Sequence, residues 1–329
     1  MKKLINRPDT FLEESLRGFA AAHADLLELD PRMRFLRRRQ LNPGKVALVS
    51  GGGAGHEPLH IGFVGRGMLD AACPGQIFTS PTPDQIVQAV RAVDTGGGAL
   101  LVVKNYEGDV MNFDMAAEMG GDRIARVLVD DDVAVKPAAQ GFGRRGVAGT
   151  VIVEKMLGAA AEEGCDLAAL ERLGAHLVPR IRSMGVALKP CTMPALGRPT
   201  FELGPDEMEL GVGIHGEAGV RRAMLMSADA IAAELLDAIL AELPLARRTP
   251  VLLLVNGFGG TPMIELYAMA HAARLGLEKR GIAIARNAVG SFASSLDMAG
   301  CSITLAALDD GMIRHWDAPV ETVAFRWGR

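Results

Sequence analysis

Two histidines of this 329-residue chain lie beside glycines, where the backbone can approach a ligand closely. His56 follows the run 50–55 (SGGGAG), and His215 lies in the segment 211–217 (GVGIHGE). Glycine permits backbone conformations and close contacts that a side chain would forbid, so the run 50–55 is expected to form a loop that binds a small ligand. An imidazole can act as a general base or as a nucleophile near neutral pH. Both segments are therefore predicted to act on a small polar molecule, with a structural role as the alternative for His215.

A lysine and an aspartate join these histidines as candidate site residues. Lys104 and Asp109 lie in the segment 104–109 (KNYEGD), directly after the apolar run 99–103. That run and the run 45–49, which precedes the glycines, are both predicted to be strands of a parallel sheet. Parallel sheets bind their ligands at the carboxyl ends of the strands. The lysine, the aspartate and the two histidines are therefore the residues expected to carry the chemistry.

Two common nucleotide-binding motifs do not fit the glycine run. No Gly-Lys-Ser/Thr follows the glycines, so nothing there could hold a β-phosphate and its magnesium as a P-loop does. His56 occupies the third glycine position of a dinucleotide fingerprint, where it would hinder the packing of helix on strand. A second Gly-x-Gly-x-x-Gly sequence, at 141–146, follows no convincing strand, and an irregular loop is expected there. Nicotinamide binding is therefore disfavoured.

No metal site is predicted. The sequence from His56 to His60 (HEPLH) formally matches a zinc signature that needs both histidines on one face of a helix. Pro58 favours a helix that begins after His56, so the two histidines need not converge. The four cysteines form no Cys-x-x-Cys pair, which excludes a cysteine zinc site and a disulfide framework. For the three aspartates at 130–132, turn-capping carboxylates are favoured over a divalent cation site.

The composition is that of an ordinary α/β enzyme. Hydrophobic residues make up 49% and charged residues 22%, and the net charge of −4 lacks the basic excess needed to bind nucleic acid or anionic membranes. The five arginines between 32 and 39 predict a solvated, partly helical surface, with a docking patch for an acidic partner as the alternative. No signal-peptide core and no apolar stretch of membrane-spanning length is found. The expected location is the cytoplasm.

Helix and strand signals alternate along the chain, which predicts an α/β fold. We expect two α/β domains with mainly parallel sheets, residues 1–183 and 184–329. Helices are predicted at 10–28, 82–92, 112–119, 228–242 and 150–184, the last interrupted at Gly164 and Gly174; further strands are predicted at 123–129, 251–255 and within 185–220.

Taken together, these motifs resemble the dihydroxyacetone kinase K subunits, the substrate-binding half of a sugar kinase. The matching segments cover almost the whole chain and occur in the order found in that family. They are 44–58 (GKVALVSGGGAGHEP), 73–83 (CPGQIFTSPTP), 104–109 (KNYEGD), 130–136 (DDDVAVK), 143–149 (GRRGVAG), 208–217 (MELGVGIHGE), 295–298 (SLDM) and 316–319 (WDAP).

The resemblance implies a role for each candidate residue. The family holds its ketone substrate as a hemiaminal on a histidine that maps onto His215. His56 maps onto the general base, and Asp109 onto the residue that relays or orients the proton. The remaining substrate-binding positions map onto Gly53, Ala54, Gly55 and Lys104. The family fold is two α/β domains with the site between them, usually in a homodimer.

The resemblance also implies a partner. Phosphoryl transfer needs a nucleotide and a magnesium clamp, and the chain stops soon after the segment 316–319. We therefore expect no cofactor in this chain and a separate L-type subunit that carries ADP or ATP with Mg. The segment 243–250 is shorter than in longer family members, which bears on local shape and partner contacts. The alternative function is a non-catalytic ketose-binding co-regulator, and a nicotinamide oxidoreductase comes third.

Overall fold

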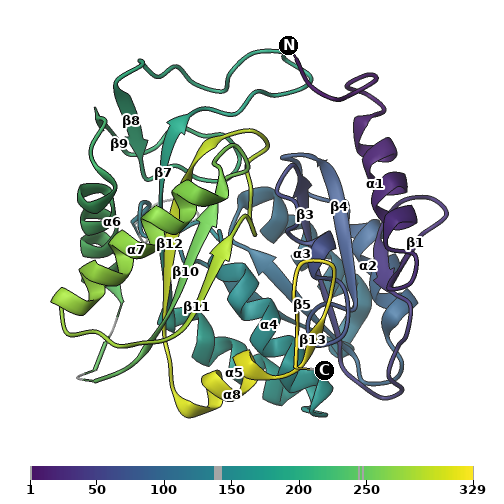
Figure 1. Cartoon of the computed structure of the whole chain (residues 1–329). Coiled ribbons are helices and arrows are strands. Elements are labelled where there is room, and N and C mark those ends of the chain that lie inside the picture. Colours follow the sequence, from purple (N-terminus) through teal and green to yellow (C-terminus); the bar gives the residue numbers. More distant parts are fainter. Residues whose placement is uncertain (1, 137–142, 244, 247, 329) are drawn as a thin grey trace. The chain divides into compact units, whose positions relative to one another are not determined.

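The computed structural model describes residues 2–136, 143–243, 245–246 and 248–328 (Figure 1). Contacts between Cα atoms divide these residues into two compact units. The His56 unit contains residues 2–129, 150–177 and 314–328, and the His215 unit contains the described residues of 130–149 and 178–313. Each unit is built around one six-stranded sheet, which confirms the predicted α/β fold.

The units differ from the expected ranges, 1–183 and 184–329, because the chain returns to each sheet. The described residues of 130–149 belong to the His215 unit although they precede residue 183. The Ser183 N–H donates to the carbonyl oxygen of Asp131 at 2.7 Å, which joins this segment to the sheet of the His215 unit. The Glu321 N–H donates to the carbonyl oxygen of Arg66 at 2.9 Å, which ties the C-terminal segment to the His56 unit. Hydrophobic periodicity reports local structure and carries no signal for such returns.

The His56 unit has a sheet of strand order β1-β2-β4-β3-β5-β6. Strands β4, β3, β5 and β6 run parallel; β2 pairs with β4 in the antiparallel direction, and β1 pairs with β2 in the antiparallel direction. Strands β3 and β5 are buried along their whole length, as parallel strands covered on both faces must be. The strands are β1 (Leu27–Leu29), β2 (Leu36–Arg38), β3 (Ala47–Ala54), β4 (Ala71–Ile77), β5 (Ala99–Lys104) and β6 (Ile124–Val129).

Helices connect these parallel strands and pack against the sheet. The predicted helix at 82–92 is confirmed as α2 (Pro83–Val93), which begins at a capping box in which the Thr82 N–H donates to Gln85 Oε1 at 2.9 Å. The other helices are α1 (Phe11–Ala22), α3 (Glu107–Gly120), α4 (Gly149–Glu162) and α5 (Leu167–Leu177), with short 3₁₀ helices at Ile61–Phe63 and Gly121–Arg123; a third 3₁₀ helix, Val178–Arg180, begins the return to the His215 unit.

The His215 unit has a sheet of strand order β11-β10-β12-β7-β8-β9. Among its described strands β10 and β11 run parallel and every other neighbouring pair is antiparallel, which differs from the mainly parallel sheet expected. The helices α6 (Ala228–Glu242) and α7 (Met263–Lys279) pack on it through apolar faces. The strands are β7 (Ile181–Lys189), β8 (Glu207–Leu210), β9 (Arg221–Met224), β10 (Val251–Gly257), β11 (Ile284–Gly290) and β12 (Ala299–Ala307).

The chain ends in α8 (Asp310–Asp317) and a hairpin of β13 (Val320–Glu321) and β14 (Arg326–Trp327). Among the residues that the structure describes, no helix is long and apolar enough to span a membrane.

Two local expectations are wrong. The helical region predicted to reach residue 184 ends at Leu177, and β7 begins at Ile181, because residues 181–187 are buried on both faces of a sheet. The arginine run does not form a partly helical surface, because residues 36–38 form β2. There the Arg38 guanidinium is 5% exposed and pairs with Asp70 at 3.1 Å. Pairing with carboxylates also argues against a free docking patch for an acidic partner.

Candidate functional site

The glycine run is part of a strand and not a loop. Residues 50–54 continue β3, and the chain turns only after Ala54. A Cβ atom at Gly53 would lie 2.5 Å from the backbone of Phe78 and Thr79, and one at Gly52 would collide with Lys104 Nζ. Glycine is therefore required because neighbouring atoms occupy the space of a side chain. The expectation of a glycine loop was wrong, because these glycines lie in a strand. The expected close approach is present, since neighbouring atoms lie where a side chain would be.

The structure brings Lys104 and Asp109 together. Lys104 is the last residue of β5, and Asp109 lies in the first turn of α3. The Lys104 ammonium donates to Asp109 Oδ2 at 3.0 Å and to the carbonyl oxygen of Gly51 at 3.3 Å. The two side chains are 0% and 3% exposed. A buried ammonium must be paired, and the pair fixes the lysine beside the glycines of β3.

His56 lies in the turn that follows β3. Its ring is buried and stacks on Phe78, with 5.0 Å between the ring centroids and 17° between the ring planes. Gly55 adopts a φ of 100°, which a side chain would disfavour, and its N–H donates to Glu57 Oε2 at 2.9 Å. The turn therefore holds the imidazole in one orientation.

No α-helix follows this turn, contrary to the helix expected to begin at Pro58. Residues 57–60 form turns and the 3₁₀ helix begins at Ile61. The two histidines of the HEPLH sequence thus do not lie on one helical face. Within the described part of the chain, no group of three or more His, Cys, Asp or Glu side chains could hold a metal ion.

His60, which sequence analysis did not select, connects to the lysine and aspartate. Its Nε2 lies 3.2 Å from Lys104 Nζ, and its Nδ1 lies 2.5 Å from Glu154 Oε1 and 3.0 Å from Ser50 Oγ. Glu154 is a residue of α4 and is 0% exposed, and His60 is 4% exposed. Four titratable side chains thus form one buried chain of contacts in the order Asp109, Lys104, His60, Glu154.

Burial favours the uncharged forms of His60 and Glu154, the last two groups of this chain of contacts. Desolvation lowers the pKa of His60 well below its usual value, and the electrostatic effects of Lys104 and His56 act in the same direction. Desolvation raises the pKa of Glu154 well above its usual value, against the opposing effect of the Lys104 charge. Both shifts therefore favour the uncharged forms of these two side chains.

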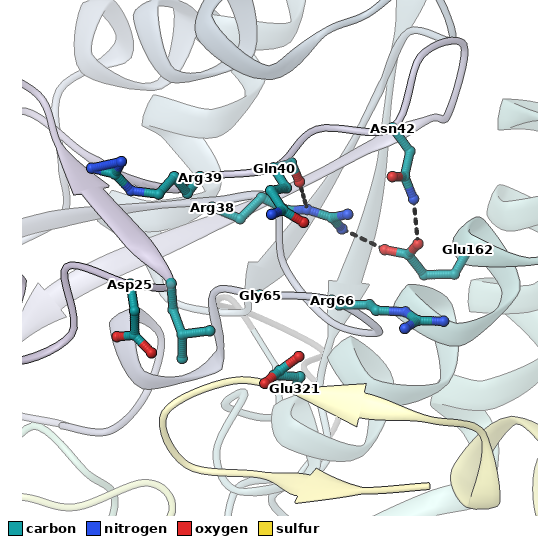
Figure 2. A pocket seen from close by; sticks show the side chains of 10 residues that line it. Asp25, Arg38, Arg39, Gln40, Asn42, Gly65, Arg66, Glu162 and Glu321 are labelled. Atoms are coloured by element: carbon teal, nitrogen blue, oxygen red, sulfur yellow. Dashed lines mark hydrogen bonds and ion pairs between the residues drawn. The ribbon is translucent and has the colours of Figure 1, made fainter. Parts of the chain in front are cut away.

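Of two cavities in the His56 unit, the smaller is lined by residues of the glycine run and by His60, and the larger lies elsewhere. A cavity of about 10 Å³, room for roughly one water molecule, is lined by Gly52, Gly53, Ala54 and His60 among others. The second, of about 630 Å³, lies at β2 and is lined by side chains of both charges, including Arg38, which bonds Glu162 (Figure 2). None of the predicted site residues lines this larger cavity.

His215 lies in the His215 unit, in the segment 211–217 after β8, and is half-buried. Arg145 holds both ends of this segment: its Nη2 donates to the carbonyl oxygen of Gly211 at 2.7 Å, and its Nη1 pairs with Glu217 Oε1 at 3.2 Å. The same guanidinium donates through Nε to Asp132 Oδ2 at 2.8 Å. One arginine therefore fixes the segment that carries the histidine.

Two of the aspartates at 130–132 accept hydrogen bonds, Asp131 from backbone N–H groups and Asp132 from the Arg145 guanidinium. Asp131 accepts from the N–H groups of Val147 and Gly149, both at 2.8 Å, and from the hydroxyl of Ser183 at 2.5 Å. Burial raises the pKa of Asp132 to about 6, against the lowering effect of the Arg145 charge. These contacts are those of capping carboxylates, as favoured from the sequence. Part of the sequence 141–146 lies outside the described residues, as do residues 244 and 247 of the segment 243–250.

Comparison with known families decides what kind of protein this is. The model of the Dak1 domain matches residues 17–324. The chain belongs to the Dak1 family. This confirms the family resemblance predicted from the sequence.

Full-length Dak1 relatives include subunits of bacterial kinases. The chain is 46% identical to the "PTS-dependent dihydroxyacetone kinase 1, dihydroxyacetone-binding subunit DhaK" of Listeria innocua, over 99% of this chain and 100% of that protein. It is 45% identical to the "PEP-dependent dihydroxyacetone kinase, dihydroxyacetone-binding subunit DhaK" of Escherichia coli, over the full length of both.

Two solved Dak1 structures resemble the chain closely. The dihydroxyacetone kinase of C. freundii in complex with AMP-PNP and Mg²⁺ matches with a TM-score of 0.89 and 33% identity, over 99% of this chain and 61% of that chain. The dihydroxyacetone kinase operon co-activator Dha-DhaQ matches with a TM-score of 0.89 and 36% identity, over 95% and 97% of the two chains.

The residues that sequence analysis missed in this Dak1 chain gave a weak signal. Glu154 stands in the apolar helical run 150–161, where a carboxylate facing the core needs a partner. His60 was considered only as a zinc ligand. A buried carboxylate and a histidine near the glycines could have suggested a pair, but the 94 positions between them follow no local period.

Proposed function

We propose that this chain is the dihydroxyacetone-binding subunit of a dihydroxyacetone kinase. The observation that carries the proposal is identity of 45–46% over the full chain to subunits of that name. The buried Lys104–Asp109 pair beside the glycines of β3 supports it, because it supplies fixed polar groups at the carboxyl ends of parallel strands. The substrate is dihydroxyacetone or a related short ketose.

We further propose that the ketose is held covalently on His215. A ring nitrogen of the neutral imidazole adds to the ketone carbon, the carbonyl π electrons move to oxygen, and the proton lost from the ring is taken up by that oxygen. Glycerol and other polyols of similar shape have no carbonyl carbon to attack. Covalent capture therefore distinguishes them more strongly than hydrogen bonds to near-isosteric hydroxyls could.

The phosphoryl transfer step uses the His56 unit. His56 takes the proton of the terminal hydroxyl as the oxygen of that hydroxyl attacks the γ-phosphorus of ATP. The bond from this phosphorus to the ADP oxygen breaks, ADP leaves, and Asp109 orients or shares the proton. The backbone at Gly53, Ala54 and Gly55 and the ammonium of Lys104 bind the substrate. The nucleotide, ADP or ATP with Mg, is brought by an L-type partner subunit, and the chain forms a homodimer.

Native mass spectrometry of the chain with dihydroxyacetone tests the covalent step. We expect an adduct of one ketose per chain that is absent with glycerol and absent in His215→Ala. If the parent chain forms no adduct, or His215→Ala retains it, the covalent proposal is wrong. With a nucleotide-bearing partner, His56→Ala should retain the adduct and lose turnover; normal turnover would remove His56 as the base.

A non-catalytic co-regulator is the second candidate, favoured by the structural likeness to the co-activator Dha-DhaQ. Such a sensor needs to capture the ketose and has no use for a base and a proton-orienting carboxylate. The presence of His56 and Asp109 beside the substrate-binding glycines therefore supports the kinase subunit. Absence of turnover with every nucleotide-bearing partner, alongside normal adduct formation, would favour the co-regulator.

A further inference from the structure

The chain of buried contacts from Asp109 to Glu154 extends beyond the residues assigned to the proposed reaction. Asp109 Oδ2 lies 3.0 Å from Lys104 Nζ, which lies 3.2 Å from His60 Nε2. The opposite ring nitrogen of His60 lies 2.5 Å from Glu154 Oε1. Three elements, α3, β5 and α4, and the turn after β3 contribute one residue each. A packing contact would not require four polar groups in line.

Donors and acceptors fix the direction of these hydrogen bonds. A lysine ammonium can only donate, so His60 Nε2 must accept and its proton must lie on Nδ1. The Ser50 hydroxyl donates to the carbonyl oxygen of Val102 at 2.7 Å. Its lone pairs, together with Glu154 Oε1, are then available to the Nδ1–H group. The network therefore assigns the Nδ1–H tautomer to His60.

We propose that His60 and Glu154 are positioning residues that hold the Lys104 ammonium on Asp109, and so fix the carboxylate that orients the transferred proton. This inference rests on the proposed function. Lysine has a flexible four-carbon stem and a rotating ammonium group. Three acceptors, Asp109, His60 and the Gly51 carbonyl, leave its ammonium one orientation.

The electrostatics agree with a positioning role. The lowered pKa of His60 keeps an unprotonated Nε2 available to the ammonium. The raised pKa of Glu154 favours the uncharged carboxyl group at the end of the chain of contacts. Glu154 Oε2 has no hydrogen-bond partner among the described residues, which also favours the uncharged carboxyl group.

Two substitutions of His60 separate positioning from packing. The glutamine amide of His60→Gln reaches the place of Nε2 and can accept from Lys104, while the shorter amide of His60→Asn reaches only the place of Nδ1. With a nucleotide-bearing partner, we expect His60→Gln to stay within about 3-fold of the parent kcat and His60→Asn to lose about 10- to 100-fold, the cost of a misplaced group. The His215 adduct should change little in both.

Glu154 offers a matched pair that does not alter the histidine. Glu154→Gln keeps an oxygen acceptor for the Nδ1–H group, and Glu154→Leu removes it at similar volume. We expect Glu154→Gln to retain kcat within about 3-fold and Glu154→Leu to lose about 10-fold or more. Thermal unfolding of all four variants controls for folding. Equal kcat values within both pairs would overturn the proposal.

A measurement without turnover separates this inference from the proposed function. In the chain labelled with ¹⁵N-histidine, the His60 ring, identified by its loss in His60→Gln, should show a protonated Nδ1 and an unprotonated Nε2 between about pH 6 and 8. A protonated Nε2 would overturn the network even if the kinase reaction proceeds. Absence of the ketose adduct in a parent chain that shows the expected tautomer would instead overturn the proposed function alone.

Discussion

At the scale of single residues, the position of Lys104 depends on the absence of a side chain at Gly52. Lys104 can lie beside β3 because Gly52 has no side chain. The buried ammonium then finds the Asp109 carboxylate at 3.0 Å and two further acceptors. A buried charge without such partners would cost several kcal/mol. The glycine thus sets the place of the lysine.

The change Gly52→Ala tests this dependence. Its Cβ would collide with Lys104 Nζ, so the ammonium must move away from Asp109. We expect a loss of about 1–3 kcal/mol in the free energy of unfolding, as in overpacked cores, and a fall in turnover of at least about 10-fold. Urea unfolding and the coupled kinase assay measure the two effects.

Gly18→Ala is the matched control, since no described atom lies within 4 Å of a Cβ at that position of α1. It should leave turnover unchanged and stability unchanged or slightly raised. Normal turnover in Gly52→Ala would show that the lysine need not lie where the structure places it.

Asp132 gives a pH dependence at a single residue. Burial raises the pKa of its carboxyl group from 3.8 to about 6 in the folded state. The folded chain therefore binds this proton more readily than the unfolded chain, and the stability contributed by it is lost as the pH rises from about 4 to 6. Over this pH range, the free energy of unfolding of the parent chain should fall by on the order of 3 kcal/mol more than that of Asp132→Asn. Urea unfolding of both chains at several pH values measures the difference; a gain with rising pH would contradict the assignment.

At the scale of elements, regular segments were predicted more accurately than the site. The helix at 82–92 was found because Thr82, Pro83 and Gln85 form a capping box that is written locally in the sequence. The strand at 99–103 was found because a buried parallel strand is a continuous apolar run. The glycines at 50–54 were mistaken for a loop, because their strand conformation is imposed by neighbours on β4 and β5 that are distant in sequence.

For the site residues too, contacts between residues close in sequence were predicted, and contacts between residues distant in sequence were missed. Lys104 and Asp109 were predicted because they flank one strand end, five positions apart. His60 and Glu154 were missed because their contact is made by tertiary packing of α4 on the turn after β3. The role of Arg145 was missed for the same reason, since it joins Asp132 to the segment 211–217 across 66 positions or more.

The conformation of the segment 211–217, which carries His215, should depend on Arg145. In Arg145→Gln the bonds to the Gly211 carbonyl and to Glu217 are lost, and both ends of the segment are released. We expect adduct formation with dihydroxyacetone to slow by about 10-fold or more, because a displaced nucleophile loses its orientation. Native mass spectrometry over time measures the rate.

The neighbouring arginine supplies the control. Arg144 is buried to a similar extent and bonds Glu242 Oε2 on α6 at 2.9 Å, away from the His215 segment. Arg144→Gln should change the rate of adduct formation by less than about 2-fold at comparable thermal stability. An equal effect of both changes would indicate a general loss of stability and not a local one.

At the scale of the whole molecule, the proposed division of work predicts how activity is reconstituted. The solved C. freundii kinase, determined with AMP-PNP and Mg²⁺, has a chain of which this protein matches 61%. We propose that the L-type partner supplies what phosphoryl transfer further requires, a clamp for nucleotide and magnesium. This chain with dihydroxyacetone, ATP and Mg²⁺ alone should thus form the adduct without phosphorylating it, and an added L-type subunit should restore turnover. Supplying ADP with a phosphoprotein donor in place of ATP distinguishes the two sources of phosphate. Phosphorylation by the isolated chain would contradict the division of work while leaving the covalent step intact.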